Sequence, residues 1–355
     1  MNQALINSLG SIKREIVNFS RSQSFYLILV AMAIVLIVPP FLSNYVVSEV
    51  LTRILIFAIY ASSWNLLASS GQGSLGHAAF LGIGGFVSAL ITIKLGVPPI
   101  FALLLGGLLS AGIGFLIGLT CVRLKAWFLA MVTFGFSVII VTIFSELDAF
   151  TGAVMGFPTP LIADRGLPFY YVTFTIAAIS IMAMYIVMKS KIGLAFKAIH
   201  QNELEAKMIG INTAKYRLIA FIISTFFAGL AGGLFAQSIR FIDRTVFGAE
   251  YSFLPLMICV IGGLGTIEGP IIGSAIYWLI DSYLPAVDGI LNGLIGREGL
   301  ISLFPAVSSV GPYLRTLGLG LFLLVVVIFA PKGLTPLIKK AYNYLRNSLK
   351  EEKSK

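Results

Sequence analysis

Residues 71–76 read Gly-Gln-Gly-Ser-Leu-Gly, which fits the pattern G-x-G-x-x-G of a phosphate-binding turn. In a dinucleotide-binding protein such a turn follows a β-strand, begins a helix, and is followed ~20 residues later by an acidic residue that binds the ribose. Here the turn lies between two apolar stretches of membrane-spanning length, and no Asp or Glu occurs between Val50 and Ser145. The match is therefore accidental, and the flanking apolar stretches decide the fold.

The composition extends this interpretation to the whole chain. Of its 355 residues, 58% are hydrophobic and 11% are charged, whereas soluble proteins carry roughly 25% charged residues. We therefore expect an all-α, polytopic transmembrane bundle of about ten membrane segments, some of them short or broken. Apolar stretches occupy residues 25–42, 50–70, 76–93, 97–120, 126–145, 168–188, 217–239, 249–263, 269–284 and 313–330.

The first stretch follows basic residues, as the apolar core of a signal peptide also does. It continues to Pro39-Pro40 without a small-x-small cleavage site, so we interpret it as a retained span. The expected organisation is a cytoplasmic N-terminal segment (1–24), a membrane domain (25–331) with a cytoplasmic loop (189–216), and a basic cytoplasmic tail (332–355).

Basic residues set the expected orientation in the cell (inner) membrane. The formal net charge is +10, and the positive-inside rule places clusters of Lys and Arg in the cytoplasm. Cytoplasmic N- and C-termini put all the main clusters inside. These clusters are Arg123 and Lys125; Lys189, Lys191, Lys197, Lys207, Lys215 and Arg217; and Lys332, Lys339, Lys340 and Arg346. Because the basic residues do not share one face, we expect no nucleic-acid partner.

The run Ser69–His77 supplies hydroxyl groups, an amide and an imidazole at membrane depth. Irregular backbone at that depth must be buried in protein or line a cavity. One interpretation is that Ser70, Gln72, Ser74 and His77 line a path that a small polar solute crosses. The other is that the run is a connection whose polar groups bond to neighbouring helices. The sequence leaves both open.

We expect no metal, cofactor or disulfide site. Cys121 and Cys259 lie in separate apolar runs, and His77 and His200 are too far apart in the sequence to suggest a metal centre. Ser74 and His77 have the spacing i, i+3, but no acid is present to orient the imidazole as a base. We therefore do not expect an intramembrane enzyme.

The cytoplasmic loop after the sixth stretch predicts a short amphipathic helix from Leu194 to Gly210. Apolar residues recur there at helical spacing, and Glu203 and Lys207 form an i, i+4 pair in the favourable order. Gly210 followed by Asn212 predicts the end of the helix. Such a helix is typical of a docking element for another protein. The alternative is a helix on lipid headgroups, which its glutamates disfavour because anionic lipid repels them.

Four runs carry a family resemblance. They are WNLLASSGQGSLGHAAFLGIGGF (64–86), KIGLAFKAIHQNELEAKMIGIN (191–212), FAGLAGGLFA (227–236) and VIGGLGTIEGPIIGSA (260–275). In this order and spacing they resemble the membrane subunits of ATP-binding-cassette importers for branched-chain amino acids, in particular the larger of the two paired permeases. The resemblance covers roughly residues 25–335.

The resemblance implies a helical permease with a sister permease subunit (a heterodimer), two cytoplasmic ATPase subunits and an extracytoplasmic solute-binding protein. It also implies that the cytoplasmic helix couples the permease to the ATPases. The residues assigned to that coupling are Leu194, Lys197, Glu203, Ala206 and Gly210. The chain departs from its relatives at Leu194, where they usually carry Arg, and at His200-Gln201, where they often have Arg-Glu.

The sequence independently agrees with a permease driven by separate ATPases. No G-x-x-x-x-G-K-[ST] motif occurs, so we expect no nucleotide site and no enzymatic activity. Carriers driven by protons or sodium keep ionisable residues in their spans; here Arg53 can pair with Glu49 one turn away, near a membrane edge. The expected cargo is a branched-chain amino acid. The alternatives are urea or another small neutral solute carried by the same architecture, and a stand-alone channel or secondary carrier.

Overall fold

The computed structural model describes residues 39–42, 46–121, 124, 126–152, 154–295, 311–331 and 333–336. The expected first span (25–42) and the basic tail (332–355) therefore lie outside the described residues, except for 39–42 and 333–336.

Six helices of the described chain are long and apolar enough to cross a membrane. Each corresponds to a stretch expected from hydropathy, because about 20 consecutive apolar residues span the hydrocarbon core as a helix. They are α3 (Thr52–Ala68, with a candidate span that begins at Glu49), α4 (His77–Leu95), α5 (Pro99–Cys121), α6 (Ala126–Glu146), α8 (Leu167–Lys189) and α11 (Thr213–Ile239). The helical fold class is confirmed, whereas the total of ten segments stays a prediction.

Three further helices correspond to the last three stretches. The helix α12 (Ala249–Gly262) has 14 residues and is short, as expected. The helix α13 (Gly269–Ile295) has 27 residues, so the prediction of a short ninth segment at 269–284 is wrong. Polar residues end the apolar stretch, but most polar residues weaken a helix only slightly and do not terminate it. The helix α15 (Gly311–Phe329) matches the tenth stretch.

The remaining elements are short. They are η1 (Pro39–Phe41), η2 (Val46–Leu51), α7 (Asp148–Thr151), β1 (Phe157–Pro158), α9 (Lys191–Gln201), α10 (Glu203–Met208), β2 (Phe241–Ile242) and η3 (Arg244–Phe247). The strands pair antiparallel, with Phe157 opposite Ile242. Within the described residues this two-residue ladder is the exception to an all-helical chain.

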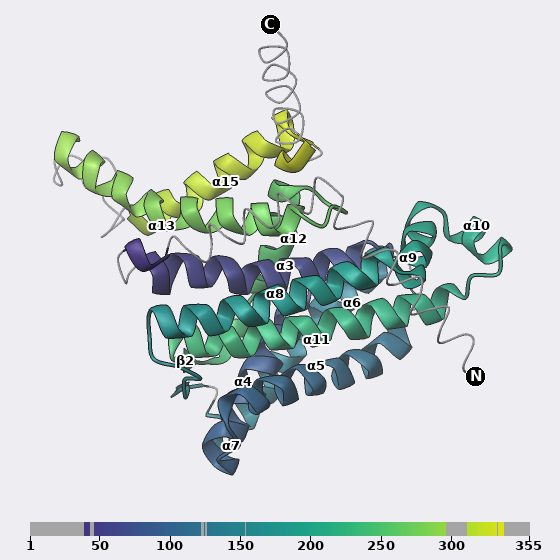
Figure 1. Ribbon diagram of the computed structural model, residues 1–355, viewed down its shortest axis with the longest axis horizontal. Helices are drawn as coiled ribbons and strands as arrows, with labels where there is room; N and C mark the ends of the chain where they lie inside the picture. Colours follow the sequence, from purple (N-terminus) through teal and green to yellow (C-terminus); the bar gives the residue numbers. More distant parts are fainter. Residues whose placement is uncertain are drawn as a thin grey trace, which may run out of the picture.

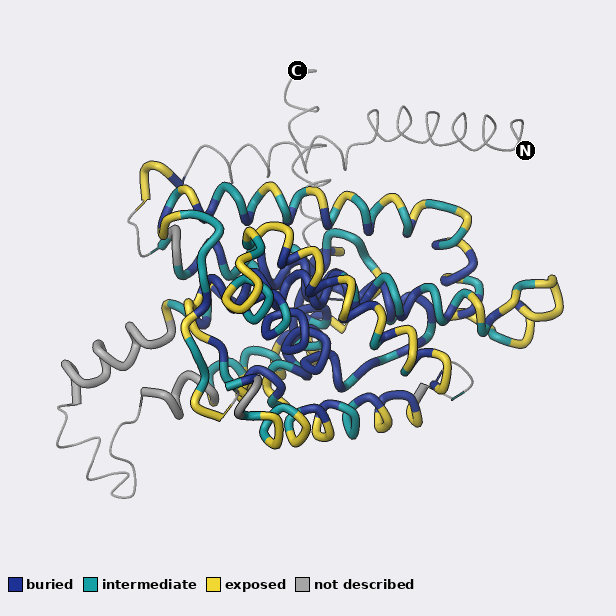
Figure 2. The backbone as a smooth tube through the Cα atoms, turned by 90° about the horizontal axis from the view of Figure 1, so that it is seen from below, coloured by how far each residue is buried: buried dark blue, intermediate teal, exposed yellow. Residues whose placement is uncertain are grey.

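The helices α3 and α11 form the centre of the bundle. In their membrane-length segments 78% and 72% of the residues are buried, against 28% in α6 and in α8. Figure 2 shows the buried backbone gathered in the middle of the molecule, with exposed positions on the outer helices. Outer helices that expose large apolar side chains are suited to a hydrocarbon surrounding.

Small residues let the inner helices touch. A Cβ atom added to Gly84 of α4 would lie 2.0 Å from the backbone oxygen of Gly229 in α11. A Cβ atom added to Gly114 of α5 would lie 2.2 Å from Oγ1 of Thr225 in α11. Packing, rather than the hydrophobic effect, drives helix association in a membrane, and small residues make that packing close.

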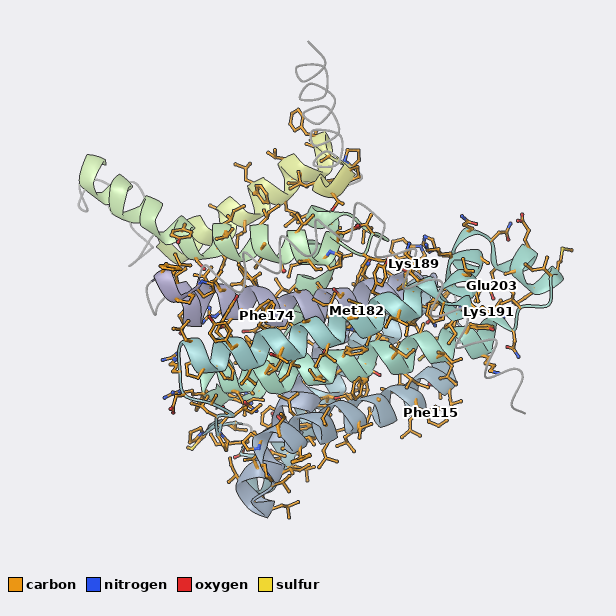
Figure 3. All side chains as sticks on the ribbon, in the orientation of Figure 1. Phe115, Phe174, Met182, Lys189, Lys191 and Glu203 are labelled. Carbon is orange, nitrogen blue, oxygen red and sulfur yellow. The ribbon has the colours of Figure 1, made fainter. Side chains whose placement is uncertain are left out.

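The two ends of the bundle differ. Figure 1 shows α9 and α10 projecting from one end, and β2 at the other. Figure 3 places Lys189, Lys191 and Glu203 at the α9 end, while Phe174 and Met182 lie along α8 and Phe115 on α5. The α9 end is therefore the one that the basic residues assign to the cytoplasm.

Candidate functional site

The glycine-rich run folds back into the bundle. After α3 ends, Ser69 N–H donates to the Asn65 oxygen (2.9 Å) and Gly71 N–H donates to the Ala68 oxygen (3.0 Å), with Gly71 at φ +77°. The chain then returns along α3, where Trp64 Nε1 donates to the backbone oxygen of Ser74 (2.7 Å). As a result, α4 begins beside the interior of α3 and not beyond its end.

His77, the first residue of α4, lies within the core. Its Nε2 is 3.0 Å from Ser63 Oγ, and its ring is 5.2 Å from that of Tyr60. Ser63 Oγ already donates to the Tyr60 oxygen (2.7 Å), so the Ser63 hydroxyl accepts from His77 Nε2–H. This assignment leaves Nδ1 of His77 as an acceptor.

All four predicted path residues are buried: Ser70, Ser74 and His77 at 0% exposure and Gln72 at 3%. Ser70 Oγ donates to the Leu67 oxygen (2.7 Å). Among the described residues, however, Ser74 Oγ and His77 Nδ1 are buried without a hydrogen-bond partner. A connection whose polar groups bond to their neighbours thus explains Ser70. It does not explain Ser74 Oγ and His77 Nδ1, because nearly all buried polar groups have a hydrogen-bond partner.

A second polar feature, missed in the sequence, lies on another face of α3. A small open-sided hollow is lined by Ser62, Asn65, side chains of α8 such as Met184, and Ile267 after α12. Ser62 Oγ has no hydrogen-bond partner among the described residues. The sequence does not predict such a hollow, because the residues that a single polar side chain contacts are distant from it in the sequence.

The cytoplasmic loop contains two helices. The prediction of one helix from Leu194 to Gly210 is wrong, because the chain breaks at Asn202 between α9 and α10. The Oδ1 atom of Asn202 accepts from Leu204 N–H (3.0 Å) and Glu205 N–H (3.4 Å), which makes Asn202 the N-cap of a new helix. The predicted end is confirmed, since Gly210 has a φ of +84°.

Glu203 ties the loop to the bundle. Its carboxylate is 2.8 Å from Lys207 Nζ, which confirms the predicted i, i+4 pair, and 2.9 Å from the buried Arg217 of α11. The hydrogen bond from Lys207 and the charge of Arg217 lower the pKa of Glu203 below its ordinary value. Glu203 therefore has a structural role within this chain.

The exposed surface of the loop is apolar at its tip. Leu204, Met208 and Ile209 are 72%, 86% and 74% exposed. Of the other predicted coupling residues, Leu194 is 62% exposed, and Lys197 and Gly210 are exposed as well. Ala206 is 2% exposed, so the chain itself covers it, and its assignment to the coupling contact stays a prediction.

Residues 46–328 match the protein family described as "Branched-chain amino acid transport system / permease component". The chain is 28% identical over 271 residues to the high-affinity branched-chain amino acid transport system permease protein LivM of Salmonella typhimurium, covering 68% of this chain and 64% of that protein. It thus spans about two thirds of the length of this relative.

Shorter matches reach permeases with other named cargoes. The autoinducer 2 import system permease protein LsrC of Yersinia enterocolitica is 35% identical over 29% of this chain and 31% of its own length. The guanosine ABC transporter permease protein NupQ of Bacillus subtilis is 30% identical over 35% of this chain and 40% of its own length. A solved structure, PsaBC from Streptococcus pneumoniae in complex with Fab, has a TM-score of 0.43 at 15% identity, covering 82% of this chain and 94% of that one.

Proposed function

The chain belongs to the family of permease components of branched-chain amino acid transport systems, and on this premise we propose that it is the membrane-spanning permease subunit of an ATP-binding-cassette importer for branched-chain amino acids. The observation that carries the proposal is the match over residues 46–328, which includes both the six candidate spans and the projecting α9–α10 loop. The proposed partners are a sister permease subunit, two ATPase subunits and an extracytoplasmic solute-binding protein.

The proposed energy source is the pair of ATPase subunits. The sequence has no P-loop motif. One charged residue of a span, Arg53 of α3, is paired within the chain: it is 2.7 Å from Glu49, whose other oxygen is 2.7 Å from Arg165. A proton- or ion-driven carrier needs ionisable groups available along its path, and this cluster lies at the start of α3 and not in the middle of the bundle.

The proposed contact with the ATPases is the tip of the loop. Leu204, Met208 and Ile209 are highly exposed on an element that stands outside the bundle (Figure 1). Exposed apolar residues that cluster at one place favour a protein partner. Leu194 and Lys197 of α9 are also exposed and complete the proposed contact, whereas Glu203, Ala206 and Gly210 stabilise the conformation of the loop.

The proposed translocation path follows Ser70, Gln72, Ser74 and His77. In such a path their burial corresponds to a closed state, and Ser74 Oγ and His77 Nδ1, which have no hydrogen-bond partner among the described residues, offer a donor and an acceptor to a polar solute. Single cysteines at Ser70 and Ser74 test this point. We expect a small water-soluble thiol reagent to label both cysteines during ATP turnover. The proposed path is contradicted if neither cysteine is labelled with or without turnover and if large side chains at the same two positions leave uptake normal.

Reconstitution tests the proposed function. Liposomes that contain this chain, the sister permease, both ATPases and the solute-binding protein should concentrate labelled leucine only when ATP is present inside. Concentrative uptake without the ATPases contradicts the proposal. The scarcity of charge inside the bundle also suits another small neutral solute, so uptake of urea in place of leucine supports that alternative.

A further inference from the structure

The pattern Gly-x-Gly-Ser/Thr-Leu/Ile occurs twice in the chain, at 71–75 and at 263–267. In each copy the sixth residue after the first glycine begins a helix, His77 for α4 and Gly269 for α13. The first glycine of each copy has a positive φ, +77° at Gly71 and +127° at Gly263. We name residues 71–75 turn A and residues 263–267 turn B.

Both turns bond to neighbouring residues of α3. Trp64 Nε1 donates to the Ser74 oxygen of turn A (2.7 Å). Asn65 Nδ2 donates to the Thr266 oxygen of turn B (2.8 Å), and Gly265 N–H donates to Asn65 Oδ1 (2.9 Å). The donor and the acceptor of the Asn65 amide are therefore both used to hold turn B.

The backbone of Asn65 closes the last turn of α3, from which the chain continues into turn A. The Asn65 backbone oxygen accepts from Ser69 N–H (2.9 Å) and from Ser69 Oγ (2.8 Å). The residue is 4% exposed, so water is a poor substitute for any of these partners. The side chain of Asn65 thus binds turn B, and its neighbour on α3, Trp64, binds turn A.

Each turn also contacts an element outside the central bundle. A Cβ atom added to Gly71 would lie 3.5 Å from Cα of His200 in α9, so turn A lies against the cytoplasmic loop. A Cβ atom added to Gly333 would lie 2.3 Å from Cα of Gly263, and Thr335 Oγ1 donates to the last carbonyl of α12. Turn B therefore lies against the segment that follows α15.

We propose that Asn65 is a positioning residue that couples turn A to turn B, so that displacement of α9 by the ATPases moves both turns together. The proposal rests on the proposed function, because it takes the ATPases as the source of the displacement. Turn A carries Ser74 of the proposed path, and Ile267 of turn B lines the hollow beside Ser62 and Asn65. Coupling by Asn65 makes the two irregular segments beside α3 respond as one unit.

Amide hydrogen exchange of the intact complex, read by mass spectrometry, tests this coupling. The ATP-free complex is compared with the complex trapped by ATP and vanadate, for the wild type, Asn65→Leu and Ser62→Ala. In the wild type we expect exchange in both turns to change on trapping. In Asn65→Leu, Gly265 should exchange about tenfold faster without ATP, as the loss of one hydrogen bond predicts, and only turn A should still respond to trapping.

Ser62→Ala is the matched control, because Ser62 lies on the same helix, lines the same hollow and bonds to neither turn in the described residues. It should behave as the wild type. The proposed coupling is overturned if exchange in turn B still changes on trapping in Asn65→Leu. It is also overturned if exchange in turn B does not change on trapping in the wild type. If Asn65→Leu does not assemble, Asn65→Asp takes its place, since it keeps the acceptor for Gly265 N–H and loses the donor to Thr266. Absence of uptake by the wild-type complex contradicts the proposed function instead, which separates the two failures.

Discussion

The glycines of the run Gly71–Gly76 differ in what surrounds them. Gly71 adopts a left-handed conformation against α9. A Cβ atom added to Gly76 would lie 1.7 Å from the backbone oxygen of Thr133 in α6, whereas one added to Gly73 would meet no atom within 4 Å. A motif that resembles a phosphate-binding turn is thus explained by a tight turn and by close approach of helices, which a bilayer protein needs.

Gly76→Ala should therefore destabilise the protein, and Gly73→Ala should not. The obstacle at Gly76 is backbone, which cannot rotate away, so we expect a loss of about 1–3 kcal/mol in unfolding free energy, as for overpacked cores. Thermal unfolding of the purified chain in detergent measures the difference. Equal unfolding temperatures for the two variants would contradict the close approach of α6 to this run.

Glu203 gives the loop a pH dependence of known sign. Its pKa is lowered in the folded protein, first by the Lys207 hydrogen bond. A lowered pKa means that the stabilisation is complete above the ordinary pKa of Glu and is lost as the pH falls through the lower, folded value. Limited proteolysis at residues 202–212 should therefore accelerate only under acidic conditions below the ordinary Glu range.

The variant Glu203→Gln separates this effect from general acid unfolding. It should be cleaved faster than the wild type at neutral pH, because Arg217 loses its charged partner. Its cleavage rate should not change further across the range in which Glu203 titrates. Wild-type and variant profiles that coincide at all pH values would show that the ion pairs do not hold the loop.

At the scale of elements, the α9–α10 loop shows how a local signal changes a helix. The 3.6-residue periodicity across Leu194–Gly210 predicts one helix, but Asn202 caps a new one and redirects the chain. Leu204 and Met208 are left exposed and Ala206 becomes buried. The break also makes α10 a separate, short element at the tip of the loop. A short projecting helix of this kind can insert into a groove of a partner protein, here the proposed ATPase.

Met208→Asp should weaken ATPase docking strongly. Met208 is 86% exposed, so the change leaves the fold intact and places a charge in the proposed apolar contact. We expect the recovery of ATPases with the purified permease to fall about tenfold, the effect of a single strong interface residue. Met155→Asp is the control: Met155 is 88% exposed and lies just before β1, which pairs with β2 at the end opposite α9 (Figure 1), so this variant should retain the ATPases. Loss of the ATPases in both variants, or in neither, would place the contact elsewhere.

At the scale of the whole molecule, the sequence predicts the spans well and the interior poorly. Hydropathy is a local property, so the stretches from 50–70 to 217–239 coincide with helices within a few residues. The fold-back of Ser69–His77 onto α3 depends on contacts with Trp64 and Ser63, which periodicity does not encode. The role of Asn65 likewise cannot be predicted from one polar residue in an apolar helix, although the repeated glycine pattern of turns A and B is present in the sequence.

The overall orientation is the remaining prediction at this scale. Lysines gather at the α9 end (Figure 3), which the positive-inside rule assigns to the cytoplasm, and the opposite end carries β2 (Figure 1). Met208→Cys and Met155→Cys place one highly exposed thiol at each end, while the native Cys121 and Cys259 are 1% and 0% exposed. In intact cells a membrane-impermeant thiol reagent should label the cysteine at 155 at once and the cysteine at 208 only after permeabilisation. Labelling of the cysteine at 208 in intact cells would show that the orientation is the reverse of the predicted one. The α9–α10 loop would then lie outside the cytoplasm, where it could not contact the ATPases.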